Sequence, residues 1–241
     1  MRVLITRPEN RSGGTIVKLE QLGHDAVSFP LFAPVHDIAA AAAALATPHD
    51  ALAMTSAETV RGLSALGPAL SPHLATRVFA VGKATARAAR EAGFTDVVAS
   101  GGGGVDLANL VLDRHARSGS PRLPLLYLAG EKRMGRFEKA LAESGMDCVV
   151  AETYRMEPVA YTIEQQQALL VERKADAVML YSREAALAFF GLGIFDVSRE
   201  AIRRTLFLCL SRTVAEAVPE ELANSAVVSD NPDEDELIDL L

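Results

Sequence analysis

The sequence predicts an α/β fold of two similar parallel-sheet domains, and two observations lead to this prediction. First, short apolar runs alternate with amphipathic or Ala-rich helical segments along the chain, as in parallel strands joined by covering helices. Second, the chain repeats itself, because DALAMTSAETVRGL from Asp50 returns as DAVMLYSREAALAF from Asp176. Two further pairs keep the same order, 78–89 with 206–217 and 3–11 with 125–133. We therefore predict a duplication with halves near 2–120 and 124–241.

The predicted elements alternate in chain order. Strands are expected at 2–6, 25–32, 50–54, 77–81, 96–99, 124–128, 147–153, 176–181, 205–210 and 225–228. Helices are expected at 9–22, 38–46, 57–66, 83–92, 105–117, 134–144, 162–173, 183–190, 199–204, 212–217 and 233–241. Helices would cover both faces of each sheet. Two similar sets of strands favour two domains, although the spacing alone also fits a closed barrel.

Two strand segments differ from the others because they are long and contain proline. Residues 25–37 carry Pro30 and Pro34, and residues 147–161 carry Pro158. Proline cannot donate to a ladder, so edge or connecting positions are expected for both. They stand at equivalent places in the two repeats. We predict that they pair side by side as a two-stranded β hinge between the domains.

Composition restricts the classes of function. The chain has 241 residues and a formal net charge of -7. Residues 229–241 hold six acids and no bases, so the remainder is nearly neutral and lacks the basic stripe of a nucleic-acid binder. The start MRVLITRPEN does not fit a signal peptide, and no apolar run reaches membrane-spanning length. The isolated Cys148 and Cys209 fit small buried residues of a reduced, cytoplasmic protein.

The polar residues that follow the predicted strands are the candidate binding residues. At the carboxyl edge of a parallel sheet, helix N-termini present unpaired N–H groups that suit anions. Thr55 with Glu58 and Thr6 with Glu9 have capping-box spacing. The alternative interpretation is that the hydroxyls are only caps and the basic residues only solvated charges. The candidates are Arg7, Thr55, Ser56, Gly82, Lys83, Thr85, Ser182, Arg183, Ser211 and Thr213.

The remaining motifs predict no cofactor and no metal. The run GGGG at 101–104 is followed neither by the later glycine of a dinucleotide fingerprint nor by the Gly-Lys-Ser/Thr of a phosphate loop. The five histidines are scattered, without a Cys cluster or a nucleophile nearby, so neither a metal site nor a hydrolase triad is expected. Polar turns of two lobes around a shared cleft would suit a ligand with several carboxylates.

Four segments together resemble the uroporphyrinogen-III synthase family: VLITRP, AMTSAETV, VFAVGKATARAAREAGF and ETYRMEP. The resemblance extends in order over nearly the whole chain. It implies a bilobal protein whose chain crosses twice, with residues 1–34 and 160–241 in one domain and 35–159 in the inserted one. It also implies a cofactor-free enzyme that converts hydroxymethylbilane, a linear tetrapyrrole, into uroporphyrinogen III. Ring D would be inverted through a spirocyclic intermediate.

The resemblance assigns roles to several residues. Tyr154 in ETYRMEP matches the family's hinge-region tyrosine and is the expected proton donor to the departing hydroxyl. Arg7 matches the Arg of the opening motif, where it would hold a substrate carboxylate or brace the turn. Leu210 and Arg183 stand where the family often has Gly and Pro, which leaves the backbone of those two turns open. Polar cleft positions of the family are matched by Ser56, Thr85, Ser182 and Thr213.

Three other interpretations stay open at this point. A non-catalytic bilobal small-molecule-binding protein would have the same lobes and usually an export signal. A nucleotide- or flavin-binding enzyme would carry a Gly-rich phosphate fingerprint after a strand. A protein-interaction module would need a sizeable exposed apolar patch. The resemblance favours the enzyme, which we expect to be a cytoplasmic monomer without nucleic-acid or membrane partners.

Overall fold

A computed structural model describes residues 1–116, 123–197 and 202–241. The chain divides into two compact units. The terminal unit comprises Met1–Ala33 and Glu157–Leu241, and the inserted unit comprises Pro34–Met156. The prediction of an α/β fold with two mostly parallel sheets is confirmed.

The sheet of the terminal unit has five parallel strands in the order β11-β10-β9-β1-β2. The interior strand β1 is buried and pairs on one side with β2 and on the other with β9. Strands of this kind, buried on both faces, are near-continuous apolar runs, as RVLI and AVML are here. Their bounds are β1 Arg2–Ile5, β2 Asp25–Ser28, β9 Ala177–Leu180, β10 Leu206–Cys209 and β11 Ala226–Val228.

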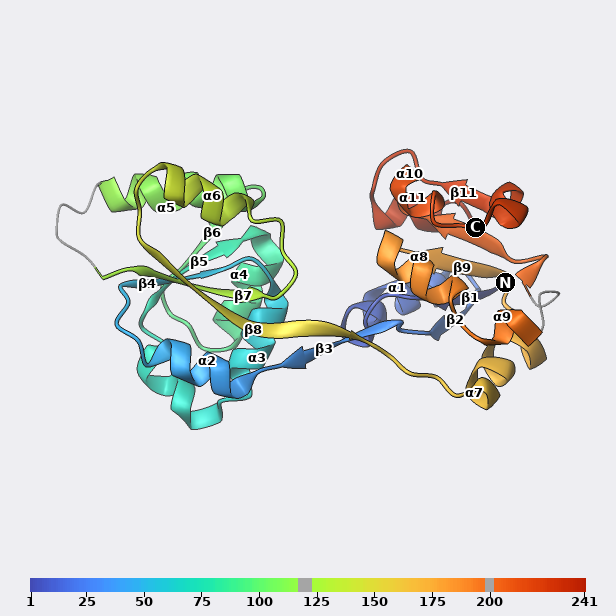
Figure 1. The fold of residues 1–241 in the computed structure, drawn as a ribbon, viewed down its shortest axis with the longest axis horizontal. Helices are drawn as coiled ribbons and strands as arrows, with labels where there is room; N and C mark the ends of the chain where they lie inside the picture. Colours follow the sequence, from blue (N-terminus) through green and yellow to red (C-terminus); the bar gives the residue numbers. More distant parts are fainter. Residues whose placement is uncertain (117–122, 198–201) are drawn as a thin grey trace. The chain divides into compact units, whose positions relative to one another are not determined.

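Helices cover both faces of this sheet (Figure 1). Val3 and Ile5 point to the face covered by α1 and α11, where Leu19 and Leu237 complete the core. Leu4 points to the opposite face, which packs against the remaining helices. These helices are α1 Glu9–Gln21 and α11 Glu234–Ile238 on the first face, and α7 Ile163–Gln167 continued by a π-helical turn Ala168–Glu172, α8 Arg183–Phe190, α9 Ile194–Val197 and α10 Arg212–Ala215 on the second.

The sheet of the inserted unit has six strands in the order β3-β8-β7-β4-β5-β6. Strands β8 to β6 are parallel to one another. The first strand of the second half, β7, therefore pairs with β4 of the first half, just as β1 pairs with β9. The bounds are β3 Phe32–His36, β4 Ala51–Met54, β5 Arg77–Val81, β6 Val97–Ser100, β7 Leu125–Gly130 and β8 Cys148–Pro158.

Two helical layers enclose this second sheet as well (Figure 1). Leu52 and Met54 of β4 pack with one layer, whereas Ala53 faces the other. This alternation is the two-residue period of a strand. The first layer holds α2 Ile38–Leu45, α3 Ala57–Ser64 and α4 Gly82–Glu91, with a 3₁₀ turn at Gly67–His73; the second holds α5 Gly104–Ala116 and α6 Arg136–Glu143.

The two proline-containing segments are neighbours. Leu31 O accepts from Val159 N at 3.0 Å, and Thr153 O accepts from Asp37 N at 2.8 Å. Residue numbers therefore rise along one strand as they fall along the other, which is antiparallel pairing. The expected strand 25–32 is broken into β2 and β3 at the Pro30 bend. Whether the β3–β8 pair acts as a hinge stays a prediction.

The remaining differences from the predicted elements are small. Helix α9 and the 3₁₀ segments Gly67–His73 and Glu220–Ser225 are absent from the prediction, and all three are too short to show a periodic apolar face. The helix expected at 199–204 lies partly outside the described residues. Within the part of the chain that the structure describes, no helix is long and apolar enough to cross a membrane.

Candidate active site

Both sheets have the doubly wound order, in which the chain runs outward in opposite directions from two central strands. Ligands of such sheets bind at the carboxyl edge, where these two strands meet. The central pair is β1 and β9 in the terminal unit, and β7 and β4 in the inserted unit. The turns after these four strands are therefore the places to look for polar groups.

In the inserted unit, Thr55 and Ser56 follow β4 and have different roles. Ser56 is the N-cap of α3, and its Oγ accepts from Glu58 N at 3.1 Å. The Thr55 hydroxyl instead lies 2.8 Å from the Tyr127 hydroxyl of β7. The predicted capping box of Thr55 with Glu58 is wrong, because the helix begins one residue later. Burial raises the pKa of Tyr127 above its usual range, so this phenol is protonated at neutral pH.

Glu58 is a buried carboxylate that the sequence prediction did not single out as a site residue. Its side chain is 3% exposed. Oε1 lies 2.8 Å from His36 Nε2, and Oε2 accepts from Arg61 Nη1 at 2.7 Å. A carboxylate this deep requires such partners. The pair fixes the end of β3 to α3, and only the tertiary arrangement brings His36 to it.

Gly82, Lys83 and Thr85 lie at the next turn of the same edge. Gly82 has φ +66°, a left-handed conformation that favours glycine, and α4 begins there directly. Lys83 is exposed, whereas Thr85 is buried in the first turn of the helix. Of these three predicted site residues, Lys83 is thus placed to meet a ligand through its side chain, and Gly82 through its backbone.

Tyr154 lies on β8 beside Gly130, the last residue of β7. Its carbonyl accepts from Glu131 N at 3.0 Å. The ring lies so close over Gly130 that a Cβ added there would be 2.6 Å from Tyr154 Cζ. The half-buried phenol lines a small cavity of about 140 Å³. The His36 ring centroid is 6.4 Å from that of Tyr154, so Tyr154 lies near the carboxyl edge of the inserted unit.

The equivalent edge of the terminal unit centres on Arg7. The guanidinium carbon lies 4.5 Å from the ring centroid of Tyr181, which follows β9. Nη1 donates to Thr15 Oγ1 at 3.2 Å and to Glu234 of α11. Thr6 donates its hydroxyl to Met179 O at 2.7 Å. The predicted capping box of Thr6 with Glu9 is therefore wrong, and Pro8 occupies the N-cap position without a side-chain bond.

The other predicted residues of the terminal unit follow β9 and β10. Ser182 is the N-cap of α8, and its Oγ accepts from Ala185 N at 3.1 Å. Ser211 is the N-cap of α10 but makes no side-chain cap bond. Arg183 and Thr213 are exposed. No non-glycine residue that the structure describes has positive φ, so Leu210 does not reproduce the conformation of Gly82.

The structure thus gathers the predicted residues into two groups, one at each carboxyl edge. Thr55, Ser56, Gly82, Lys83, Thr85 and Tyr154 belong to the inserted unit, and Arg7, Ser182, Arg183, Ser211 and Thr213 to the terminal unit. Tyr127 could have been suspected from sequence, as the one residue with a polar group in the strand LLYLAG. Nothing local indicates that Glu234 reaches Arg7, 227 residues away.

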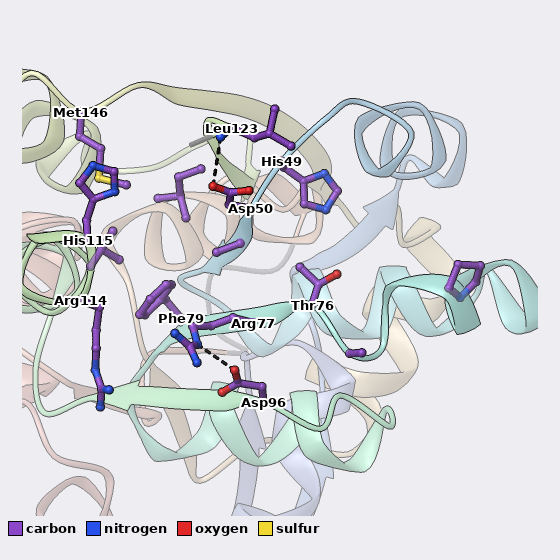
Figure 2. Close-up of a pocket in the computed structure, with 15 residues that line it drawn as sticks. His49, Asp50, Thr76, Arg77, Phe79, Asp96, Arg114, His115, Leu123 and Met146 are labelled. Carbon is purple, nitrogen blue, oxygen red and sulfur yellow. Dashed lines mark hydrogen bonds and ion pairs between the residues drawn. The ribbon is translucent and has the colours of Figure 1, made fainter. Parts of the chain in front are cut away.

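A larger cavity of about 680 Å³ lies at the opposite, amino edge of the inserted unit's sheet (Figure 2). Asp50 accepts from Leu123 N at 3.0 Å, and Arg77 Nε donates to Asp96 at 2.8 Å. The charged side chains of the lining are therefore bonded to other residues of the same lining, as the dashed lines in Figure 2 show. None of the predicted site residues lines this cavity, so it does not belong to the carboxyl-edge site.

The chemistry available at the two edges is hydrogen bonding, charge and proton donation. Among the described residues, no group of three or more His, Cys, Asp or Glu is placed to hold a metal ion. Burial raises the pKa of the Cys148 thiol to about 11 and that of Cys209 to about 12. Neither cysteine is therefore a thiolate nucleophile at neutral pH.

Comparison with known proteins agrees with this picture. The structure is similar to uroporphyrinogen-III synthetase from Helicobacter pylori 26695, with a TM-score of 0.65 and 17% identity over 100% of this chain and 98% of that one. A mutant uroporphyrinogen III synthase from the extremely thermophilic bacterium Thermus thermophilus is similar with a TM-score of 0.51 and 23% identity, over 99% of this chain and 96% of that one. No curated protein sequence matches the chain.

The likeness to these structures establishes the fold, and the sequence itself establishes the family. The profile of the family described as "Uroporphyrinogen-III synthase HemD" matches residues 15–239. This match covers most of the chain and confirms the resemblance found in the four sequence segments. The chain therefore belongs to the uroporphyrinogen-III synthase family, the cyclising lyases of tetrapyrrole biosynthesis.

Proposed function

We propose that the protein closes hydroxymethylbilane to uroporphyrinogen III with inversion of ring D. Loss of the terminal hydroxyl from ring A leaves an azafulvene electrophile. Ring D attacks it through its substituted carbon, and the resulting spirocycle fragments and recloses with ring D reversed. The observation that carries the proposal is the family match over residues 15–239, together with two carboxyl edges rich in helix N-termini.

The substrate's carboxylates bind at the strand-to-helix turns of both units. Backbone N–H groups at helix N-termini offer donors and a positive dipole end to each carboxylate. The turn at Ser56 opens α3 and the turn at Gly82 opens α4, and the first N–H groups of a helix have no partner within the helix. Ser182 opens α8 in the terminal unit. Binding by many backbone groups suits a ligand whose charges are spread over four rings.

Tyr154 donates the proton that lets the hydroxyl leave as water. An ordinary phenol is protonated at neutral pH and can act as a general acid. Its position on β8, half-buried and lining a small cavity with Asp37 and Arg155, supports access to a ligand at this edge. Tyr127 is less suited, because its hydroxyl is already bonded to Thr55 and it is buried.

The main catalytic task is regiochemistry. Hydroxymethylbilane closes by itself to the symmetrical I isomer, so the intermediate is intrinsically reactive. Positioning of ring D and fixed dipoles around the developing charge are enough to direct such a reaction. A strong nucleophile, metal or organic cofactor is not needed for these steps.

The test is to supply hydroxymethylbilane to the purified protein, oxidise the product and separate isomers I and III by chromatography. The expected result is predominantly isomer III, with isomer I in the enzyme-free control. A product mixture identical to that control would reject the proposed function. Boiled protein serves as a second control, because it shows whether heat-stable components of the preparation change the isomer ratio.

A further inference from the structure

Four side chains from distant parts of the terminal unit meet at the carboxyl edge of its sheet. They are Arg7 after β1, Thr15 of α1, Tyr181 after β9, and Glu234 at the start of α11. The carboxylate oxygen Oε1 of Glu234 accepts from Arg7 and Thr15, and Tyr181 Oη lies 3.4 Å from it. One carboxylate oxygen thus collects three donors at the point where β1 and β9 meet.

The three donors form a cluster suited to binding a carboxylate. Thr15 is completely buried, and burial raises the pKa of Tyr181 so that its hydroxyl stays protonated. The Arg7 guanidinium lies against the Tyr181 ring, which fixes its plane. A fixed guanidinium with two hydroxyls beside it provides charge-assisted hydrogen bonds to an anion.

The Glu234 carboxylate does not use all of the donors that Arg7 offers. Among the residues that the structure describes, the hydrogen bonds of the Arg7 guanidinium leave from Nη1 alone, and its buried Nε has no partner. A guanidinium usually binds a carboxylate through two parallel bonds. The Arg7 and Glu234 side chains are 24% and 27% exposed, so solvent and a dissolved ligand can reach the pair. These features are those expected if a ligand carboxylate can replace the Glu234 carboxylate at Arg7.

The main chain of α11 is held independently of Glu234. Leu237 and Ile238 are buried in the core below β1 and β9. Asp233 caps the helix by accepting from Asp235 N at 2.8 Å. Because these contacts remain when the Glu234 side chain rotates, the carboxylate can leave Arg7 without any movement of the helix.

We propose that Arg7, Thr15 and Tyr181 form a carboxylate-binding site that the chain's own Glu234 occupies, and that a ligand carboxylate replaces it. The identity of the natural ligand rests on the proposed function, in which the substrate carries carboxylates on all four rings. Glu234 then acts as a built-in competitor, which lowers affinity for polycarboxylates and favours release of product.

The test compares Glu234→Gln with the wild-type protein in binding uroporphyrin III, the oxidised and unreactive form of the product. Glutamine keeps the length and can accept the same hydrogen bonds, but it loses the charge that holds it on Arg7. Removing a partly exposed ion-pair partner should tighten binding by about fivefold, measured by isothermal titration calorimetry. Asp235→Asn is the matched control, because it removes one neighbouring charge that contacts Lys18 rather than Arg7. It should change the Kd by less than about twofold.

A second comparison tests whether the tighter binding of the Glu234→Gln variant depends on Arg7. In the background of Arg7→Gln, Glu234→Gln should no longer tighten binding. Unchanged or weaker binding in the single variant Glu234→Gln, or loss of its fold by circular dichroism, would show that Glu234 is a structural brace and would overturn the proposal. Isomer analysis of the wild-type enzyme tests the proposed function separately. Absence of isomer III with tightened porphyrin binding would reject the function and keep this site.

Discussion

The same turn of the two repeats has become two different sites. In the inserted unit the turn is Thr55-Ser56, followed by the buried Glu58; in the terminal unit it is Tyr181-Ser182, followed by the exposed Glu184. Both serines cap their helices. The residue before the cap contacts the neighbouring central strand or its turn in each case, but Thr55 meets a neutral hydroxyl and Tyr181 a guanidinium.

The comparison separates what the repeat keeps from what it changes. The shared feature is the capped helix N-terminus, which presents backbone N–H groups at both edges. The side chains around it differ, since one edge has the acid Glu58 clamped by His36 and Arg61, and the other has the base Arg7 covered by Glu234. Backbone groups can therefore bind carboxylates at either edge, whereas the proton donor that we propose, Tyr154, belongs to the inserted unit alone.

The largest expected effect is at Tyr154, which tests whether proton donation belongs to the inserted unit. Tyr154→Phe keeps the ring over Gly130 and removes only the donor. Turnover should fall by about 10²-fold, the lower end of general-acid contributions, while the melting temperature changes little. The product that still forms should be isomer III, because ring placement depends on binding. Rates come from initial velocities, and isomers from chromatography.

Tyr161→Phe is the matched control in the terminal unit. Its hydroxyl donates to Pro30 O at 3.0 Å and has a structural role. Turnover of this variant should stay within about twofold, with a stability loss of about 1 kcal/mol for one hydrogen bond. Full activity in Tyr154→Phe would contradict the acid role, and a switch to isomer I would assign Tyr154 to positioning.

The next effect concerns what the two equivalent glutamates, Glu58 and Glu184, contribute to the free energy of unfolding. Glu58→Ala leaves His36 and Arg61 without their shared acceptor, so the free energy of unfolding should fall by about 1–3 kcal/mol. Glu184→Ala alters an exposed position and should change it by less than about 0.5 kcal/mol. Urea unfolding followed by circular dichroism measures both. Equal effects of the two changes would mean that the clamp contributes nothing.

Much of the fold could be predicted because each element has a local signal. The apolar runs RVLI and AVML and the amphipathic α4 are recognisable without tertiary information. The pairing of β1 with β9 is not part of the sequence prediction, because strand pairing between the two halves of the chain has no local signal. The expected strand 25–32 differs from the structure because the chain bends near Pro30, so that β2 ends before this proline and β3 begins after it.

The candidate site could be predicted only as a set of turns. The candidates Ser56 and Ser182 lie at helix N-termini as the strand-to-helix pattern predicts, and both cap their helices. The spacing of Thr55 to Glu58 predicts a cap at Thr55, yet the Thr55 hydroxyl is hydrogen-bonded to the Tyr127 hydroxyl instead. Partners such as Glu234 and His36 come from elsewhere in the chain, and no periodicity reports long-range contacts between polar side chains.

A smaller effect is expected where the repeats differ in backbone. Gly82 has a left-handed φ, and Leu210 replaces it in the second half. Gly82→Ala should cost about 1 kcal/mol, the usual penalty for a side chain in this conformation. Gly13→Ala is the control, because Gly13 lies within α1 and an added Cβ would have no neighbouring atom within 4 Å. Alanine there should stabilise the protein by up to about 1 kcal/mol. Urea midpoints with opposite shifts would support the distinction.

The smallest effect separates a cap from a hydroxyl that only lies at a helix start. Ser182 Oγ accepts from Ala185 N, whereas Ser211 makes no such bond although both are N-cap residues. Ser182→Ala should therefore lower stability by about 1 kcal/mol, and Ser211→Ala by only a few tenths.

Affinity for uroporphyrin III should fall by no more than about 0.5–1.5 kcal/mol in either variant, because one hydroxyl is one hydrogen bond among many backbone donors. The two measurements are independent, since unfolding reports the cap and calorimetry reports the ligand. Loss of all detectable binding in Ser182→Ala, with the fold intact, would show that a single side chain dominates that edge.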